Sequence, residues 1–208
     1  MKKKTWLKPA AAILAICFLG GAISGCGKDE PEPKSESGNP KVRFTVEKYG
    51  SFVIELYPEY APATVENFLA YVNEGFYTGK IFHRVADDFM AQGGSPNGDG
   101  LSDPSQRTVK GEFSENGFTQ NTLSHTRGIV SMARTNDPNS AGSQFFICYT
   151  DCRYSLDGKY AAFGKVVEGM EVVDAFLTAE RVFPPNSIDQ KPTSPVKPIV
   201  IASAEVIS

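Results

Sequence analysis

Alternating apolar and polar residues mark the start of the folded part of the chain. Residues 42–46 place an apolar side chain at every second position, and residues 52–56 resume the alternation after a Lys-Tyr-Gly-Ser turn at 48–51. A period of two is that of a strand with one buried face. The segment therefore predicts a β-hairpin.

Two other segments have the longer period of a helix. Between residues 65 and 72 apolar side chains recur three or four positions apart, and Gly75 ends the pattern. A second segment of this kind, residues 170–177, follows Gly169. Both patterns predict amphipathic helices.

The remaining apolar segments are short and predict strands. They cover residues 81–84, 89–92, 129–133, 144–149, 161–167 and 199–207. Connections rich in Gly, Ser and Asn interrupt them. Many short strands with only two helices favour a closed antiparallel barrel, a mainly β fold, over a parallel sheet.

The first 25 residues have the pattern of a bacterial secretion signal. Lysines up to Lys8 precede an uncharged run at 9–23, which is shorter than the span of about 20 apolar residues that a membrane helix needs. Small residues before Cys26 are typical of a lipobox, in which the cysteine is acylated and becomes the new N-terminus. We predict a signal peptide at 1–25 and a lipid anchor on Cys26 at the extracytoplasmic face of the cell membrane. An ordinary cleaved signal and an uncleaved anchor are the alternatives.

Removing this signal makes the chain acidic. It takes away four lysines and no acidic residue, so 17 basic residues remain against 24 acidic ones, a net charge of −7. Such a charge argues against nucleic acid as a partner. Residues 26–40, rich in Pro, Glu and Ser, predict a disordered tether, and residues 41–208 fit one domain.

Two cysteines and two histidines remain as candidates for a metal or redox site. Cys148 lies in an apolar run, where a buried thiol is expected, and a disulfide to Cys152 across a strand end is geometrically awkward although not excluded. The pair lacks further metal ligands nearby. We expect no cofactor and no metal.

The residues that carry chemistry gather in two runs, 82–94 and 142–148. The first holds Arg84 and Gln92 eight residues apart with large apolar side chains between them, and the second holds Gln144 beside aromatic residues. A fixed cation, two amides and apolar walls suit a neutral amide that is held and polarised without being cleaved. The pattern indicates proline isomerisation.

Six segments resemble the cyclophilins, in the order of that family. They are Ala-Pro-Ala-Thr-Val-Glu-Asn-Phe at 61–68, Phe-His-Arg-Val at 82–85, Phe-Met-Ala-Gln-Gly-Gly at 89–94, Gly-Ile-Val-Ser-Met-Ala at 128–133, Gly-Ser-Gln-Phe-Phe-Ile at 142–147 and Phe-Gly-Lys-Val at 163–166. The resemblance implies an eight-stranded antiparallel barrel capped by two α-helices. It also implies peptidyl-prolyl cis/trans isomerase activity and a structural role for His83 and His125. With the predicted signal and lipid anchor, we expect the substrates to be proline-containing exported polypeptides.

In keeping with the resemblance, Arg84 is expected to be the catalytic residue, with Gln92 as its partner. Twisting an amide crosses a barrier of about 18–20 kcal/mol and localises the lone pair on nitrogen. A forked donor that is always protonated stabilises that state, and arginine has this property. Taken alone, Arg84 would more often form a surface ion pair, with Asp87 or Asp88.

The resemblance also implies a set of substrate-binding residues: Phe82, Phe89, Met90, Ala133, Arg134, Gln144, Phe146, Leu156 and Tyr160. Three positions differ from the family pattern. Ser155 replaces a tryptophan and Tyr160 a histidine of many eukaryotic members, and Arg134 replaces a common asparagine. The missing indole at Ser155 predicts weak cyclosporin binding.

Two other kinds of function are alternatives to an isomerase. A binding module would use the same barrel to hold a proline-containing partner without turnover. Arg84 argues against this alternative, because a binder needs no polarising cation. The departures at Ser155 and Tyr160 leave the alternative open. A hydrolase is not expected, since no serine or cysteine is convincingly paired with a histidine and an acid. Nothing in the sequence indicates an obligate interface, so we expect a monomer.

Overall fold

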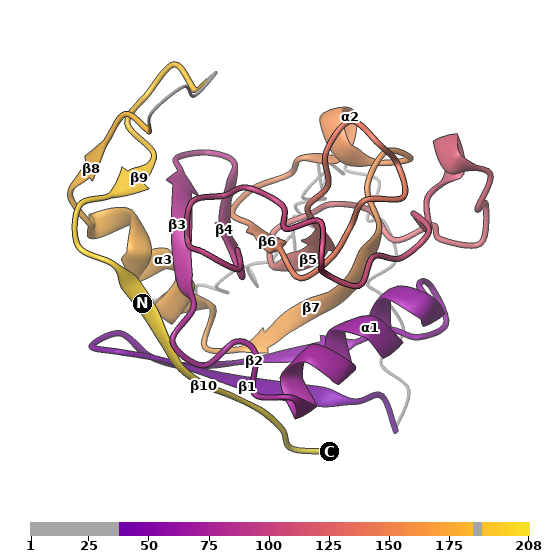
Figure 1. Cartoon of the computed structure of the whole chain (residues 1–208), viewed down its shortest axis with the longest axis horizontal. Coiled ribbons are helices and arrows are strands. Elements are labelled where there is room, and N and C mark those ends of the chain that lie inside the picture. Colours follow the sequence, from indigo (N-terminus) through magenta and orange to yellow (C-terminus); the bar gives the residue numbers. More distant parts are fainter. Residues whose placement is uncertain (1–37, 185–188) are drawn as a thin grey trace, which may run out of the picture. The chain divides into compact units, whose positions relative to one another are not determined.

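Eight strands close into a barrel in the part of the chain that the computed structural model describes, residues 38–184 and 189–208. They are β1 (Lys41–Val46), β2 (Gly50–Leu56), β3 (Ile81–Ala86), β4 (Met90–Gly93), β5 (Ile129–Met132), β6 (Phe145–Cys148), β7 (Ala162–Glu168) and β10 (Ile199–Val206). The closed order is β1-β10-β3-β4-β6-β5-β7-β2, and every neighbouring pair is antiparallel (Figure 1). The predicted mainly β, eight-stranded antiparallel barrel is confirmed.

Three α-helices accompany the barrel in the described part of the chain. Helices α1 (Pro62–Asn73) and α3 (Met170–Ala175) lie at the two predicted positions. The four-residue helix α2 (Arg153–Leu156) was not predicted, because so short a segment shows no periodicity. Single 3₁₀ turns, η1 (Ser114–Asn116) and η2 (Phe176–Thr178), and a two-stranded ribbon of β8 (Arg181–Val182) and β9 (Ser194–Pro195) complete the described elements.

The N-terminus of α1 is capped by a residue far away in the sequence. Ala61 precedes the helix without a side-chain cap, and the carboxylate of Glu112 accepts hydrogen bonds from the backbone N–H groups of Ala63 (3.0 Å) and Thr64 (2.8 Å). The first N–H groups of a helix have no partner within it, and its positive end favours a negative charge. The buried Glu112 therefore anchors α1 to the long loop that precedes β5.

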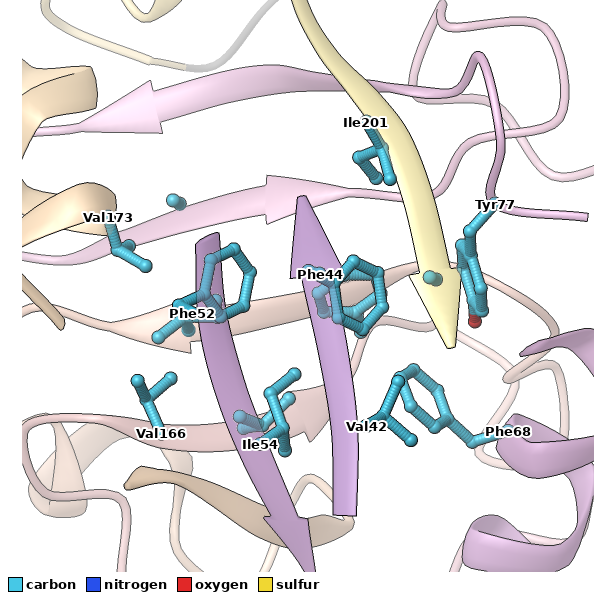
Figure 2. Packing of buried hydrophobic residues seen from close by; sticks show 14 of the residues in the cluster. Val42, Phe44, Phe52, Ile54, Phe68, Tyr77, Val166, Val173 and Ile201 are labelled. Atoms are coloured by element: carbon cyan, nitrogen blue, oxygen red, sulfur yellow. The ribbon is translucent and has the colours of Figure 1, made fainter. Parts of the chain in front are cut away.

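Aromatic side chains fill the barrel interior. Figure 2 shows Phe44 and Phe52 on neighbouring strands, with Phe68 reaching in from α1. The rings of Phe44 and Phe52 are stacked, with their centres 5.4 Å apart. The ring of Phe68 meets that of Phe145 edge to face, with a distance of 5.6 Å between the ring centres. All four are at most 1 % exposed. The apolar side chains of the first hairpin thus form one side of the core, as their alternation in the sequence predicts.

The predicted signal peptide, the predicted lipid site at Cys26 and most of the predicted tether lie outside the described residues, which begin at 38. Strand β1 begins at Lys41. Within the described ranges, no helix is both long enough and apolar enough to span a membrane.

Candidate active site

The candidate site is a row of residues across four neighbouring strands. In the strand register Arg84 on β3 lies opposite Gln92 on β4, Gln92 opposite Phe146 on β6, and Phe146 opposite Ser131 on β5. Successive side chains of a strand point to opposite faces. The adjacent row, which points into the barrel core, consists of Val85, Ala91, Ile147 and Val130. The site therefore lies on the outer face of the barrel.

A β-bulge at His83 gives Arg84 its orientation. The β3–β4 register shifts between Phe82 and Arg84, so that Phe82 pairs with Gly93 and Arg84 with Gln92. An extra residue in one strand reverses the alternation beyond it. Phe82 consequently points inward and is fully buried, while Arg84 points outward.

This bulge corrects one site prediction. Phe82 was expected to bind substrate, but the structure places it in the core against the rings of Phe52, Phe145 and Phe176. Strict alternation would have put Phe82 and Arg84 on the same face. The sequence carried no signal for the bulge.

A tight turn explains the spacing between Arg84 and Gln92. Residues 87–89 connect β3 to β4, and Asp88 has a left-handed backbone with φ of +56°. A three-residue hairpin loop needs such a residue, and Asp tolerates this conformation better than most side chains. Two residues eight apart around this turn therefore lie directly opposite each other.

An open cavity of about 290 Å³ lies on this face. It is lined by Arg84, Phe89, Met90, Gln92, Ala133, Arg134, Phe146, Leu156 and Tyr160. These are all the predicted catalytic and substrate-binding residues except Phe82 and Gln144. Gln144 lies beside the cavity and lines a second hollow of about 80 Å³, together with Gln92, Ala133 and Arg134.

Side-chain amides connect Arg84 to the second hollow. The Arg84 Nη1 group donates to Gln92 Oε1 at 3.5 Å, and Gln92 Nε2 donates to Gln144 Oε1 at 3.0 Å. Gln144 Nε2 in turn donates to the carbonyls of Gly100 (3.2 Å) and Leu101 (3.0 Å). Each amide is oriented by the next, so the chain of hydrogen bonds presents Gln92 Oε1 to the guanidinium.

Arg84 does form an ion pair, but with neither of the predicted partners. Its guanidinium pairs with Asp189, whereas Asp87 pairs with Arg181 at 2.7 Å. Asp189 lies 105 residues from Arg84. Sequence reasoning missed it because no local pattern connects residues so far apart.

Apolar side chains form the wall of the cavity. We call Ala86, Met90, Phe146, Cys148, Cys152 and Leu156, with the partly buried Phe89, Ala133 and Tyr160 against them, the outer cluster. The ring of Tyr160 meets that of Phe146 edge to face at 5.9 Å. The Arg134 guanidinium lies 4.6 Å from the centre of the Tyr160 ring and donates to the Lys159 carbonyl at 3.0 Å. Arg134 thus braces Tyr160 with its side chain, a role that the sequence did not indicate.

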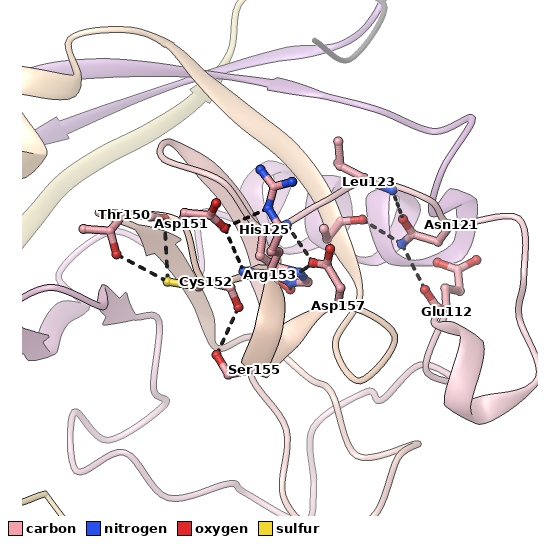
Figure 3. A network of polar contacts seen from close by, with 12 residues as sticks. Glu112, Asn121, Leu123, His125, Thr150, Asp151, Cys152, Arg153, Ser155 and Asp157 are labelled. Carbon is pink, nitrogen blue, oxygen red and sulfur yellow. Dashed lines mark hydrogen bonds and ion pairs between the residues drawn. The ribbon is translucent and has the colours of Figure 1, made fainter. Parts of the chain in front are cut away.

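A polar network behind the outer cluster corrects another expectation. His125 lies between Ser131 and Asp157, and its Nε2 is 2.9 Å from Ser131 Oγ. Its Nδ1 is 2.7 Å from Asp157 Oδ1 (Figure 3). A serine is therefore paired with a histidine and an acid, a pairing that was not expected from the sequence. Ser131 is 0 % and His125 1 % exposed, and neither lines the cavity. A nucleophile that substrate cannot reach does not support a hydrolase.

This network instead supports the wall of the cavity. The His125 ring lies parallel to that of Phe146 at 6.0 Å, and Asp157 directly follows Leu156 in the chain. Burial works to raise the pKa of Asp157, but hydrogen bonds from the His125 ring and backbone outweigh it and lower the pKa. A charged Asp157 then holds His125 behind Phe146.

Both cysteines of the domain are free and buried, as expected for Cys148. Ser155 Oγ donates to the Cys152 carbonyl at 3.0 Å, which fixes the turn of α2 (Figure 3). A hydrogen bond from the Cys148 thiol lowers the pKa of Cys152 to about 7. The same bond, together with burial, raises the pKa of Cys148.

His83 lies at the β-bulge between Phe82 and Arg84. Its Nδ1 atom is buried without a hydrogen-bond partner among the described residues. Burial and the neighbouring Arg84 lower the pKa of His83 to about 4, against a smaller opposite effect of Asp99. The ring is therefore neutral near pH 7, and it does not line the cavity.

Comparison with known proteins agrees with this geometry. The family model described as "Cyclophilin type peptidyl-prolyl cis-trans isomerase/CLD" matches residues 41–206. Peptidyl-prolyl cis-trans isomerase A of Dickeya dadantii is 43% identical over 164 residues, which are 76% of this chain and 80% of that protein. Peptidyl-prolyl cis-trans isomerase cyp18 of Streptomyces antibioticus is 41% identical over 165 residues, 76% of this chain and 93% of that protein.

Solved structures show the same barrel. A cyclophilin type peptidyl-prolyl cis-trans isomerase of Cryptosporidium parvum superposes with a TM-score of 0.65 at 31% identity, covering 82% of this chain and 98% of that one. A second crystal structure of that protein, in the presence of the dipeptide Ala-Pro, gives a TM-score of 0.64 at 32% identity, with 81% and 99% covered.

Proposed function

Because this chain belongs to the cyclophilin-type peptidyl-prolyl cis-trans isomerase family, we propose that it accelerates X-Pro rotation in exported polypeptides at a membrane surface. The isomerase activity itself is that of the family and of the named relatives. We propose in addition which residues carry the reaction, that the substrates are exported polypeptides, and that the protein acts at a membrane surface.

The observation that carries the proposal is the position of Arg84 on the rim of an apolar cavity. Phe146, Met90 and Leu156 are at most 5 % exposed and form its wall, while the Arg84 side chain remains 28% exposed. A prolyl ring would enter against the wall and leave its amide at the rim. There the guanidinium would donate to the prolyl nitrogen as the bond twists and its lone pair localises.

Gln92 has a supporting role in this reaction. It lies opposite Arg84 in the strand register, and its Oε1 atom accepts from Arg84 Nη1. The 3.5 Å separation is long for a hydrogen bond, so the contact leaves Nη1 available to substrate. We assign Gln92 to substrate backbone binding and to guiding the guanidinium.

The substrates that we propose are unfolded chains just after export. Uncatalysed X-Pro exchange takes tens to hundreds of seconds and limits the folding of many proteins. The pattern at residues 1–26 supports a lipid anchor outside the cytoplasm, and two acyl chains are enough for stable attachment. A tether of about 15 residues would keep the cavity close to the emerging chains.

Exchange spectroscopy on a short X-Pro peptide tests the catalytic assignment. Arg84→Ala is expected to lower kcat/KM by about 10²-fold or more, because an electrostatic donor in the transition state is lost. Arg127→Ala is the matched control, since Arg127 forms an exposed ion pair with Asp174. If the wild type binds the peptide but does not accelerate exchange, the binding-module alternative replaces the enzyme.

Fractionation tests the location. Cys26→Ser is expected to release the protein from the membrane fraction. Cys17→Ser, within the same predicted signal, is the control and should leave the protein attached. Equal release of both variants, or of neither, would contradict an anchor at Cys26.

Cyclosporin affinity tests the proposed effect of Ser155. Ser155 is exposed at the edge of α2, next to Leu156 of the cavity wall. We propose that cyclosporin binds weakly and that Ser155→Trp tightens binding about 10-fold, because an indole buries apolar area against the ligand. Tyr154→Trp adds an indole at a side chain that is 95 % exposed and serves as the control.

A further inference from the structure

A carboxylate from outside the barrel holds the guanidinium of Arg84. Arg84 Nε donates to Asp189 Oδ2 at 2.8 Å and Arg84 Nη2 donates to Asp189 Oδ1 at 2.5 Å. Two parallel bonds to one carboxylate make a bidentate pair, which adds both energy and geometric specificity to the ion pair. The Asp189 side chain is only 12% exposed, so the pair is shielded from solvent.

Asp189 is itself fixed to the strand that carries Arg84. Thr193 Oγ1 donates to Asp189 Oδ2 at 2.7 Å, and Thr193 is 3 % exposed. The Thr193 carbonyl accepts from the backbone N–H of Val85 at 2.8 Å, and the Thr193 N–H donates to the Val182 carbonyl at 3.1 Å. The β8–β9 ribbon thus docks on β3 directly beside Arg84 and brings the carboxylate with it.

The pair leaves the end of the guanidinium fork free. A guanidinium has five N–H groups. Asp189 accepts from two of them and Gln92 from a third, so two have no acceptor among the residues that the structure describes. Nε and Nη2 form a side edge of the guanidinium, which leaves the terminal Nη1–Nη2 edge for a substrate amide.

We propose that Asp189 is a positioning residue of the isomerase, which orients Arg84 through its side edge so that the terminal edge meets the twisting X-Pro bond. This rests on the proposed role of Arg84. A free arginine side chain loses rotamer entropy when it is fixed in one orientation. Asp189 fixes the guanidinium before substrate arrives, so this cost no longer falls on the transition state.

The same contact has one opposing effect, because a paired carboxylate reduces the positive charge that polarises the substrate. To inhibit the reaction, Asp189 would have to occupy the N–H groups of Arg84 that bind the substrate. Asp189 covers only the side edge, and two N–H groups of Arg84 remain without an acceptor among the described residues once the Gln92 contact is also counted. The geometry therefore favours positioning over inhibition.

Kinetics of Asp189 variants test the proposal. Asp189→Ala is expected to lower kcat about 10-fold while changing KM less than about 2-fold, since the effect is on the orientation of a transition-state donor. Asp189→Glu, which keeps the carboxylate, should recover part of the loss. Asp174→Ala, which removes an exposed carboxylate paired with Arg127, is the control. Unchanged or increased kcat in Asp189→Ala would overturn the proposal.

A double-mutant cycle separates positioning from a general structural effect. In the Arg84→Lys background, whose ammonium cannot form the bidentate pair, Asp189→Ala should lower kcat less than about 2-fold further. Additive losses would show that Asp189 acts independently of Arg84 and would overturn the proposal.

Hydrogen exchange of the Arg84 Nε–H group, followed by NMR, gives a readout without activity. We expect exchange to be slow in the wild type and at least about 5-fold faster in Asp189→Ala, because a shielded hydrogen bond protects the proton. Fast exchange in the wild type would overturn the inference. An inactive wild type with a slowly exchanging Nε–H would instead reject the proposed function and keep the ion pair.

Discussion

The two faces of strand β6 differ in what their phenylalanines do. Phe145 is fully buried in the barrel, with its ring within 6 Å of those of Phe44, Phe68 and Tyr77. Phe146, the next residue, is 5 % exposed and belongs to the outer cluster. One strand thus supplies stability from one side and a ligand cavity from the other, and the strand alternation alone separates the two roles.

The two faces also differ in how they are closed. Eight paired strands surround the inner face, and its aromatic rings fill it. The outer cluster keeps an open cavity of about 290 Å³ and is supported from behind by the His125–Asp157 pair. Apolar surface that is held in place but left uncovered is the usual form of a ligand site.

The largest effect is expected from Phe145→Ala, which tests the packing of the inner face. Removing a fully buried phenylalanine should lower the free energy of unfolding by about 3–5 kcal/mol, because transfer and cavity costs add. Urea unfolding monitored by circular dichroism measures this loss. A cost below about 1 kcal/mol would contradict a tightly packed interior.

His83, at the bulge between the two faces, predicts a pH effect on stability. Its pKa is about 4 in the folded chain and about 6.5 when unfolded. The unfolded state therefore binds the extra proton between these values, so stability is complete above pH 6.5 and falls as the pH drops toward 4. At pH 4.5 the loss from this residue should reach about 2–3 kcal/mol.

Unfolding titrations at pH 7 and pH 4.5 check the effect of His83. His83→Gln removes the titrating group, so it should lose less stability than the wild type over this interval. Equal losses in the two proteins would assign the acid sensitivity to other groups.

The smallest expected effect is that of Phe146→Ala on stability, which should be about 1–2 kcal/mol, because the residue borders an open cavity and less packing is lost. Its effect on kcat/KM should be larger, about 10-fold, since the prolyl ring loses part of its wall. Comparing both quantities with those of Phe145→Ala sharpens the division of roles. A greater loss of stability than in Phe145→Ala would reverse it.

Local patterns in the sequence determined most of the fold and the centre of the site. The period of two located β1 and β2 and the period of about 3.6 located the helices α1 and α3, because periodicity records which side of an element is buried. Short apolar segments located the other six barrel strands. The sequence also identified Arg84 and Gln92 as residues of the site, and the structure places them opposite each other around a tight turn. Both inferences depend only on residues that are neighbours in the chain.

The remaining features of the fold and of the site depend on the tertiary structure. The bulge that turns Phe82 into the core, the carboxylate of Glu112 on α1 and the Asp189–Arg84 pair each depend on segments that the chain brings together only when it folds. Glu112 lies 48 residues from Thr64, and Asp189 lies 105 residues from Arg84. No periodic pattern extends over such separations, so these contacts follow from the tertiary structure alone.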